Sequence, residues 1–238
     1  NQILPLSWGI NGYVTNKKLT QFSINQIIEN KKNKKIYKAI FMPSSFEMLA
    51  TLERSGLQLD GWIKKERFDL LKPAIKSAIR SVQFSQPGVF SSLLKHKAEL
   101  QQTTNGYAAH FLQQNKDFHF ILPKEKSSLW VDFVALPQNN EDSSASYSFL
   151  NYLFAPKHHY QFIKNTHKAS PIKSNEHLRL PLIQQAHFLR KISLNSIHLE
   201  TNSLSYTETW LKTLSTLAPK VFSVNDKKNK INSSGVAN

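Results

Sequence analysis

The 238-residue chain contains no cysteine, which excludes disulfides, thiolate metal sites and cysteine nucleophiles. Glycine is also scarce: only seven are present, and the phosphate-loop and nucleophile-elbow patterns GxGxxG, GxxxxGK and GxSxG do not occur. No apolar run reaches the roughly 18 residues of a membrane-spanning helix. The nine histidines show no HExxH or other metal-ligand spacing. We therefore expect no metal, no cofactor and no catalysis.

Acidic residues are few, 16 against 31 lysines and arginines, and the net charge is +15. Such an excess predicts an anionic partner, such as nucleic acid, lipid headgroups or a cell-surface polymer. The basic residues lie in dispersed runs, however, and do not form one stripe interleaved with aromatic residues, so nucleic acid is a poor fit. The run KKNKKIYK at 31–38 is best explained as a solvated loop. With 40% hydrophobic and 11% aromatic residues, the chain has the composition of a globular protein.

One carboxylate interrupts an apolar segment. Residues 130–136, WVDFVAL, form an aromatic and β-branched run that ends at Pro137, which predicts a buried strand of an α/β sheet. Burying an ionised carboxylate costs several kcal/mol unless it is paired, so Asp132 lies where the strand opens into a cleft or forms a salt bridge within the fold. Trp130 shares its strand face. An aromatic ring beside a carboxylate suits an organic ammonium group.

Helical signals follow this strand. After a polar loop at 138–142, apolar residues recur at near-helical spacing over 147–154 and stop at Pro156. A second helix is predicted over 157–165, and SPIKSN at 170–175 predicts an extended segment. Amphipathic helices are also predicted at 65–83, where Pro73 introduces a break or kink, and at 206–217.

The order of aromatic-x-Asp strand, helix ending in LFAPK, second helix and SP loop resembles the type 2 periplasmic solute-binding proteins of ABC importers. The spermidine/putrescine-binding members are the most similar. Upstream, LPLSWGINGYVTN at 4–16 resembles their first crossover strand. Residues 38–59 resemble the next unit, a strand at 39–42 and a helix that Ser44 or Ser45 begins and Gly56 ends.

The resemblance implies an α/β fold in which a mixed sheet is flanked by helices. It places a second lobe at 5–125, the crossover strand and C-terminal helices of the first lobe at 126–220, and a disordered basic tail at 221–238. It also implies that the N-terminal part of the first lobe lies outside this sequence. In that case, the helices from about 141 onward should expose apolar surface.

For the site, the resemblance implies that Asp132 pairs with a ligand amine, Trp130 stacks on the aliphatic chain and Glu47 binds a second amine. Ser44, Thr104 and Lys168 stand where the family carries a carboxylate, a tryptophan and a tyrosine. A lysine there would oppose a cationic ligand.

The implied function is the substrate-binding component of a periplasmic ABC importer, which closes on a polyamine or related small solute and docks on a membrane permease. The alternative is a basic, non-catalytic module that binds an anionic polymer or a partner protein.

Overall fold

The computed structural model describes residues 3–19, 21–28, 37–55, 82–136 and 143–186, the strand 197–198, and the single positions Pro73, Lys76, Ile79 and Phe188. Of the helix predicted at 65–83, the structure describes Pro73, Lys76 and Ile79, which are helical, and residues 82–83. The predicted end of this helix is wrong, because Gln83 lies in a short strand with Phe84. The rest of this helix, the helix predicted at 206–217, the tail at 221–238 and the helix stop at Gly56 lie outside the described residues, as does most of the basic run at 31–38.

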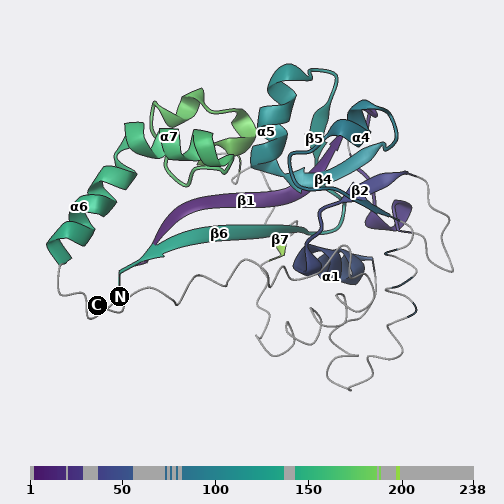
Figure 1. The fold of residues 1–238 in the computed structure, drawn as a ribbon, viewed down its shortest axis with the longest axis horizontal. Coiled ribbons are helices and arrows are strands. Elements are labelled where there is room, and N and C mark those ends of the chain that lie inside the picture. Colours follow the sequence, from purple (N-terminus) through teal and green to yellow (C-terminus); the bar gives the residue numbers. More distant parts are fainter. Residues whose placement is uncertain are drawn as a thin grey trace, which may run out of the picture.

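One mixed sheet organises the molecule (Figure 1). Its strand order is β3-β2-β4-β1-β6-β7, and β5 also pairs with β1. The strands are β1 (Ile3–Thr15), β2 (Ala39–Phe41), β3 (Gln83–Phe84), β4 (Leu100–Thr104), β5 (His119–Ile121), β6 (Ser127–Ala135) and β7 (Ile197–His198). The α-helices are α1 (Ser45–Arg54), α4 (Ser91–Leu94), α5 (Asn105–Gln114), α6 (Ser143–Phe154) and α7 (Pro156–Thr166). Short 3-10 turns are η1 (Ile24–Gln26), η2 (His177–Arg179) and η3 (Leu182–Gln184).

Strand β1 connects the two ends of the molecule. Its first half pairs antiparallel with β6, and its second half pairs antiparallel with β4 and β5. The strands that the sequence predicts at 4–16 and 130–136 are therefore present as β1 and β6, and their role as crossovers between two lobes stays a prediction. The division into lobes at 125/126 stays a prediction.

Helices cover both faces of β1 because its side chains alternate between them. On one face Tyr13 packs in a core with Met48 and Leu52 of α1. On the other face Val14 packs with residues of α5, and Trp8 and Ile10 pack with Ala169 beyond α7. Figure 1 shows α1 on one side of the sheet and α5 and α7 on the opposite side.

Local signals set the helix boundaries as predicted. Ser44 caps α1, where its hydroxyl accepts from the backbone N–H of Glu47 at 3.3 Å. Helix α5 begins at Asn105. Helix α6 ends two residues before Pro156, and α7 begins at that proline. Proline is tolerated there because the backbone N–H that it lacks would have no partner in the first turn of a helix. Residues 170–175 contain neither helix nor strand, as the SPIKSN motif predicts.

Strand β6 is less buried than its composition predicts. Ser127 and Ser128 are buried, but exposure increases along the strand, and 59% of Phe133 is accessible. The prediction of a fully buried strand is therefore wrong for its second half. A run of apolar residues indicates strand conformation without showing what covers each face, and here β6 emerges from the core.

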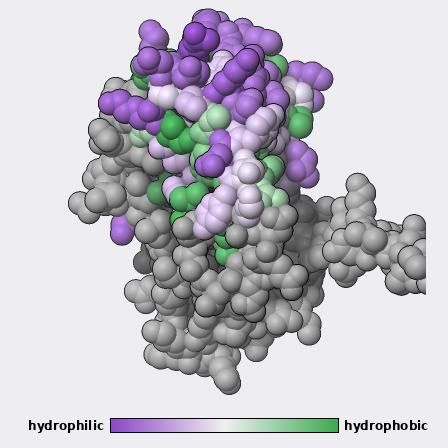
Figure 2. All heavy atoms as spheres, turned by 90° about the vertical axis from the view of Figure 1, so that its left-hand side faces the viewer, coloured by the Kyte–Doolittle hydropathy of each residue, from purple (hydrophilic) through white to green (hydrophobic). Residues whose placement is uncertain are grey.

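Apolar side chains gather at the end of the molecule where α6 lies. Figure 2 looks onto this end and shows apolar residues below the hydrophilic side chains. The exposed large apolar residues there are Ile3 and Leu4 of β1, Phe133 of β6, and Tyr147, Phe149 and Tyr152 of α6. The expectation that α6 exposes apolar surface is confirmed.

Candidate functional site

Trp130 and Asp132 lie side by side on one face of the β1–β6 ladder. In the strand register Gly9 faces Trp130 and Ser7 faces Asp132. The indole lies directly on Gly9, since a methyl group at that position would come within 2.0 Å of the ring. The hydroxyl of Ser7 donates to Asp132 Oδ2 at 2.6 Å. Strand pairing therefore aligns an aromatic ring and a carboxylate, as the spacing of the two residues predicts.

An ammonium group occupies this arrangement. Lys168 Nζ lies 2.6 Å from Asp132 Oδ2 and 5.8 Å from the centroid of the Trp130 ring. Asp132 was expected either to face a cleft or to form a salt bridge within the fold, and the structure shows the salt bridge. The pair is partly exposed, since 39% of the Asp132 side chain and 34% of the Lys168 side chain are accessible. The contacts are those expected of a bound organic amine.

The backbone of Lys168 is fixed beside β1. Trp8 exchanges both backbone hydrogen bonds with Ala169, at 3.0 and 2.9 Å, so this segment lies along the edge of β1 opposite to β6. The carbonyl of Lys168 accepts from Gln184 Nε2 at 2.7 Å. The lysine side chain thus crosses β1 to reach Asp132 from a rigid base.

The electrostatics of Asp132 reflect these neighbours. Partial burial acts to raise the pKa of the carboxyl group, but hydrogen bonds from Lys168 and Ser7 and the charge of Lys168 outweigh it. The pKa therefore lies below the usual range of an aspartate. The carboxylate is ionised at neutral pH and able to bind a cation.

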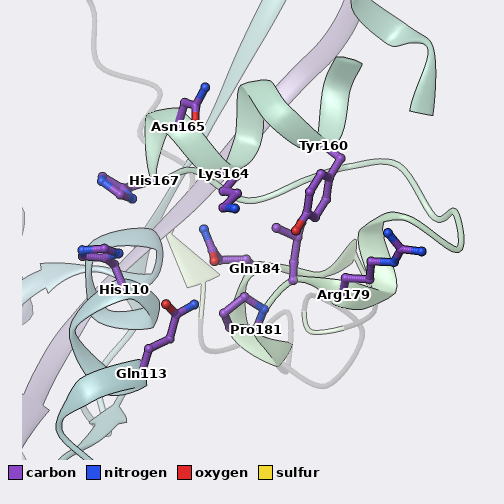
Figure 3. A pocket seen from close by; sticks show the side chains of 10 residues that line it. His110, Gln113, Tyr160, Lys164, Asn165, His167, Arg179, Pro181 and Gln184 are labelled. Carbon is purple, nitrogen blue, oxygen red and sulfur yellow. The ribbon is translucent and has the colours of Figure 1, made fainter. Parts of the chain in front are cut away.

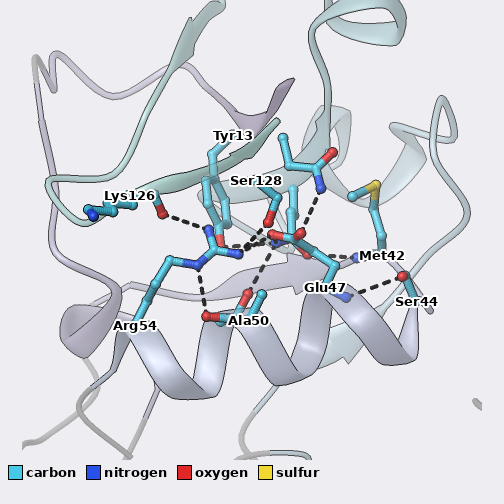
Figure 4. A network of polar contacts seen from close by, with 11 residues as sticks. Tyr13, Met42, Ser44, Glu47, Ala50, Arg54, Lys126 and Ser128 are labelled. Carbon is cyan, nitrogen blue, oxygen red and sulfur yellow. Dashed lines mark hydrogen bonds and ion pairs between the residues drawn. The ribbon is translucent and has the colours of Figure 1, made fainter. Parts of the chain in front are cut away.

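Glu47 is placed differently, inside a closed polar network (Figure 4). It is buried, and Arg54 Nη2 contacts Glu47 Oε1 at 2.9 Å, with 9% and 4% of the two side chains accessible. Gln102 Nε2 donates to the same oxygen at 3.0 Å, and Asn11 Nδ2 donates to Oε2 at 2.6 Å. Both carboxylate oxygens therefore have protein donors.

Arg54 ties this network to β6. Its guanidinium also donates to the carbonyls of Ala50 and Lys126 and to the hydroxyl of Ser128, at 2.8 to 2.9 Å. Burial raises the pKa of the nearby Tyr13, and the negative charge of Glu47 adds to the shift. Glu47 and Arg54 both lie on α1, and their hydrogen bonds to Asn11, Gln102 and Ser128 hold this helix against the sheet.

The two remaining predicted positions, Ser44 and Thr104, lie beside the Glu47 network. Ser44 caps α1, as described above. Thr104 is half-buried at the end of β4 and pairs with Asn11 of β1, and its hydroxyl makes no capping bond to α5. The structure thus brings Trp130, Asp132 and Lys168 into contact, while Glu47 and Ser44 meet on α1.

Sequence reasoning missed Ser7, Gly9 and Asn11. They occupy alternate positions of β1 and so share its site face. Within the described residues, Asn11 Oδ1 is a buried acceptor without a hydrogen-bond partner. The sequence does contain a signal for these residues. Small or polar residues at every second position, 7, 9 and 11, indicate one face of the strand that differs from the apolar face at 8 and 10.

A separate basic hollow lies on the opposite side of the sheet, between α5, α7 and the segment 179–184 (Figure 3). Its volume is about 540 Å³. Figure 3 shows the imidazoles of His110 and His167 together, with Lys164 and Arg179 around the same space, and none of the described residues that line it is a carboxylate. Burial lowers the pKa of His167, and His110 lowers it further. Such a surface can receive an anion.

No group of three or more histidine, aspartate or glutamate side chains is placed to hold a metal ion within the part of the chain that the structure describes. No helix in the described ranges is long and apolar enough to cross a membrane.

No family model and no curated protein matches the chain. Solved structures do match. The spermidine/putrescine ABC-transporter substrate-binding protein PotD of Streptococcus pneumoniae gives a TM-score of 0.61 at 14% identity, covering 92% of this chain and 69% of that one. The TpPotD lipoprotein of Treponema pallidum gives 0.61 at 15% identity, covering 90% and 68%. A periplasmic thiamin-binding protein gives 0.55 at 15% identity, covering 93% and 67%.

These similarities confirm the predicted fold class, a mixed α/β structure of the type 2 periplasmic-binding-protein architecture. The solutes named for the matching proteins differ, spermidine/putrescine for one and thiamin for another. Structural similarity at 14–15% identity shows the fold alone and does not identify the solute.

Proposed function

We propose that the chain is a non-catalytic, periplasmic solute-binding component of an ABC importer. The solute is a polyamine or a related organic amine bound on the β1–β6 face, and the partner is a membrane permease. The observation that carries the solute class is the ammonium of Lys168 held between Asp132 and Trp130. The names of the structures that share the fold support the transport role.

The proposed contacts follow from the geometry. Asp132 would accept from a solute ammonium at the position that Lys168 Nζ now occupies, and Trp130 would contact the adjoining methylene groups. We propose a structural role for Glu47, in place of the predicted second amine contact, because both of its oxygens already accept protein hydrogen bonds. Ser44 likewise acts as a helix cap in this proposal.

A second acceptor lies further along the same face. Asn11 is four residues from Ser7, which separates their Cα atoms by about 13 Å at the rise of an extended strand. Its buried Oδ1 atom accepts no hydrogen bond from any of the described residues, so it is an acceptor that a donor could still fill. This separation favours spermidine over the shorter putrescine. Thr104, opposite Asn11, would border the distal end of such a solute.

Calorimetric titration of spermidine and putrescine into the protein and into Asp132→Asn tests the solute assignment. Losing the charge of a paired carboxylate in a binding site costs roughly 2–5 kcal/mol, so the variant should bind about 30- to 5,000-fold more weakly. Asp117→Asn, at a turn beyond α5, is the matched control and should bind like the parent. Equal binding by parent and Asp132→Asn would contradict the assignment.

A second candidate function is a basic module that binds an anionic partner, and the hollow between α5 and α7 favours it. Lys164 and Arg179 supply cations there, and His110 and His167 supply ring nitrogens. Binding of heparin that falls by orders of magnitude between low and physiological salt, and that depends on Lys164 and Arg179, would support this candidate.

A further inference from the structure

The amine site contains an ammonium supplied by the protein itself. We infer that Lys168 is an internal competitor of the solute: its side chain occupies the Trp130–Asp132 position, and a solute amine binds by displacing it. This inference rests on the proposed function, since it specifies how the same site is regulated.

The contacts of Lys168 are those that the solute would make. The ammonium is 2.6 Å from Asp132 Oδ2 and faces the Trp130 ring at 5.8 Å, while the hydroxyl of Ser7 donates to the same oxygen and orients the carboxylate. An external ammonium could not make the same short contact with Asp132 Oδ2 while Lys168 stays there. Binding of the two amines is therefore mutually exclusive at this oxygen.

Displacement needs no backbone movement. The segment around Lys168 is fixed by the bonds between Ala169 and Trp8 and by the bond from Gln184. Close packing adds to this, since a side-chain carbon on Gly106 of α5 would come within 1.6 Å of the His167 carbonyl oxygen. A change of side-chain rotamer is thus sufficient to release Asp132, and the competitor stays tethered beside the site.

The two ion pairs on this face differ in how easily they open. About a third of each side chain of the Lys168–Asp132 pair is accessible, and exposed pairs of this kind are weak. The Arg54–Glu47 pair is buried and Arg54 makes three further hydrogen bonds, so removing either partner would leave a buried charge. Of the two carboxylates, only Asp132 can be exchanged between protein and solute.

While Lys168 occupies the site, no solute amine can bind there. The apparent affinity for the solute is therefore the intrinsic affinity multiplied by the fraction of time that the site is free. For a pair of this exposure, removal of the lysine should tighten amine binding about three- to tenfold. The competitor also selects against simple monoamines, because a solute that contacts Asp132 alone makes no bond that Lys168 does not already make. A polyamine with a second contact overcomes it.

The test is calorimetric titration of spermidine and of n-butylamine into the protein, Lys168→Met and Lys168→Arg. Lys157→Met on α7 is the control, because Lys157 is exposed and has no ion pair within the described residues. We expect Lys168→Met to bind both amines about three- to tenfold more tightly than the parent, and Lys168→Arg and Lys157→Met to bind like the parent.

Equal affinities of parent and Lys168→Met, with binding that still depends on Asp132, would overturn the competitor while leaving the proposed amine site intact. If neither protein binds an amine in an Asp132-dependent manner, the amine site itself fails, and the competitor fails with it. Carbon NMR titration of the Asp132 carboxyl checks the pair without any solute: its pKa should rise in Lys168→Met, and an unchanged pKa would also overturn the inference.

Discussion

Two carboxylates on the same face of the protein have different roles because their neighbours differ. Asp132 is partly open and holds one lysine, whereas Glu47 is enclosed by an arginine and two amides. A carboxylate in the first setting can exchange its partner, since solvent screens the separated charges. A carboxylate in the second cannot, because separation leaves an unpaired charge in the core.

Replacing Glu47 by glutamine tests this distinction. The substitution leaves Arg54 as an uncompensated buried cation, so the free energy of unfolding should fall by about 3 kcal/mol. Urea unfolding followed by circular dichroism measures the loss. Glu53→Gln, on the same helix and with no ion pair in the described part of the chain, should change stability by less than about 0.5 kcal/mol.

The outcome for binding is equally informative. When the two proteins are compared at the same concentration of folded protein, Glu47→Gln should bind spermidine with the affinity of the parent. Loss of binding in a folded Glu47→Gln protein would restore the ligand role that the resemblance implies and contradict the structural one.

Residue types alone predicted part of this arrangement. The WVDF motif predicted that Asp132 either faces a cleft or forms a salt bridge, and the structure shows a salt bridge with the ammonium of Lys168. That a solute amine binds there stays a proposal. The partner of Asp132 was not predictable, because Lys168 is 36 residues away and reaches Asp132 only through pairing of its neighbour Ala169 with Trp8. The partner of Glu47 was close in sequence but was not predicted either. Arg54 lies seven residues after Glu47, and no sequence pattern indicates that its side chain is buried.

At the scale of elements, helix α7 is attached to β1 through a pair of buried histidines. His159 Nε2 donates to the carbonyl of Leu6 at 2.9 Å, which leaves Nδ1 as an acceptor for His177 Nε2 at 2.8 Å. Ser174 contacts the remaining nitrogen of His177 at 2.6 Å. Every ring nitrogen of the two histidines has a partner, and a single proton lies between His159 Nδ1 and His177 Nε2.

This arrangement makes stability depend on pH. Burial lowers the pKa of both His159 and His177, and the charge of His159 lowers that of His177 further. Because each pKa is lower in the folded state than in the unfolded chain, protons bind preferentially to the unfolded chain. The stabilisation is complete above the ordinary histidine pKa of about 6.5 and is lost as the pH falls below it.

We therefore expect the free energy of unfolding to fall between pH 7 and pH 5.5, by at most about 1.4 kcal/mol per pH unit for each histidine. Urea unfolding across this range measures the slope. The slope should decrease in His177→Gln and remain in His158→Gln, whose histidine lies toward the surface of α7. An unchanged slope in His177→Gln would contradict the account of the pair.

Elements were more predictable than their burial. Periodicity and proline positions gave α6 and α7 closely, and Ser44 marked the start of α1, because these signals act within a few residues. The exposure of Phe133 depends on what lies over β6 in three dimensions, and the composition of a strand carries no such information.

At the scale of the whole molecule, the proposed function requires a basic protein to bind a cationic solute at the carboxylate of Asp132. The net charge of +15 opposes the approach of a polyamine at long range, although salt screens this repulsion beyond about 8 Å at physiological ionic strength. Short-range contacts at Asp132 and Trp130 therefore decide amine binding. The basic hollow on the other side of the sheet, at His110 and His167, is a distinct place to which an anion would be drawn.

The location of a bound amine is thus the decisive observation. Intermolecular NOE spectra of isotope-labelled Lys168→Met with spermidine would record it directly. The predicted result is a set of NOEs from the solute methylene protons to the indole ring of Trp130, with none to Trp8, which lies on the opposite face of β1. NOEs that involve His110 and His167 and leave out Trp130 would contradict the assignment of the amine site.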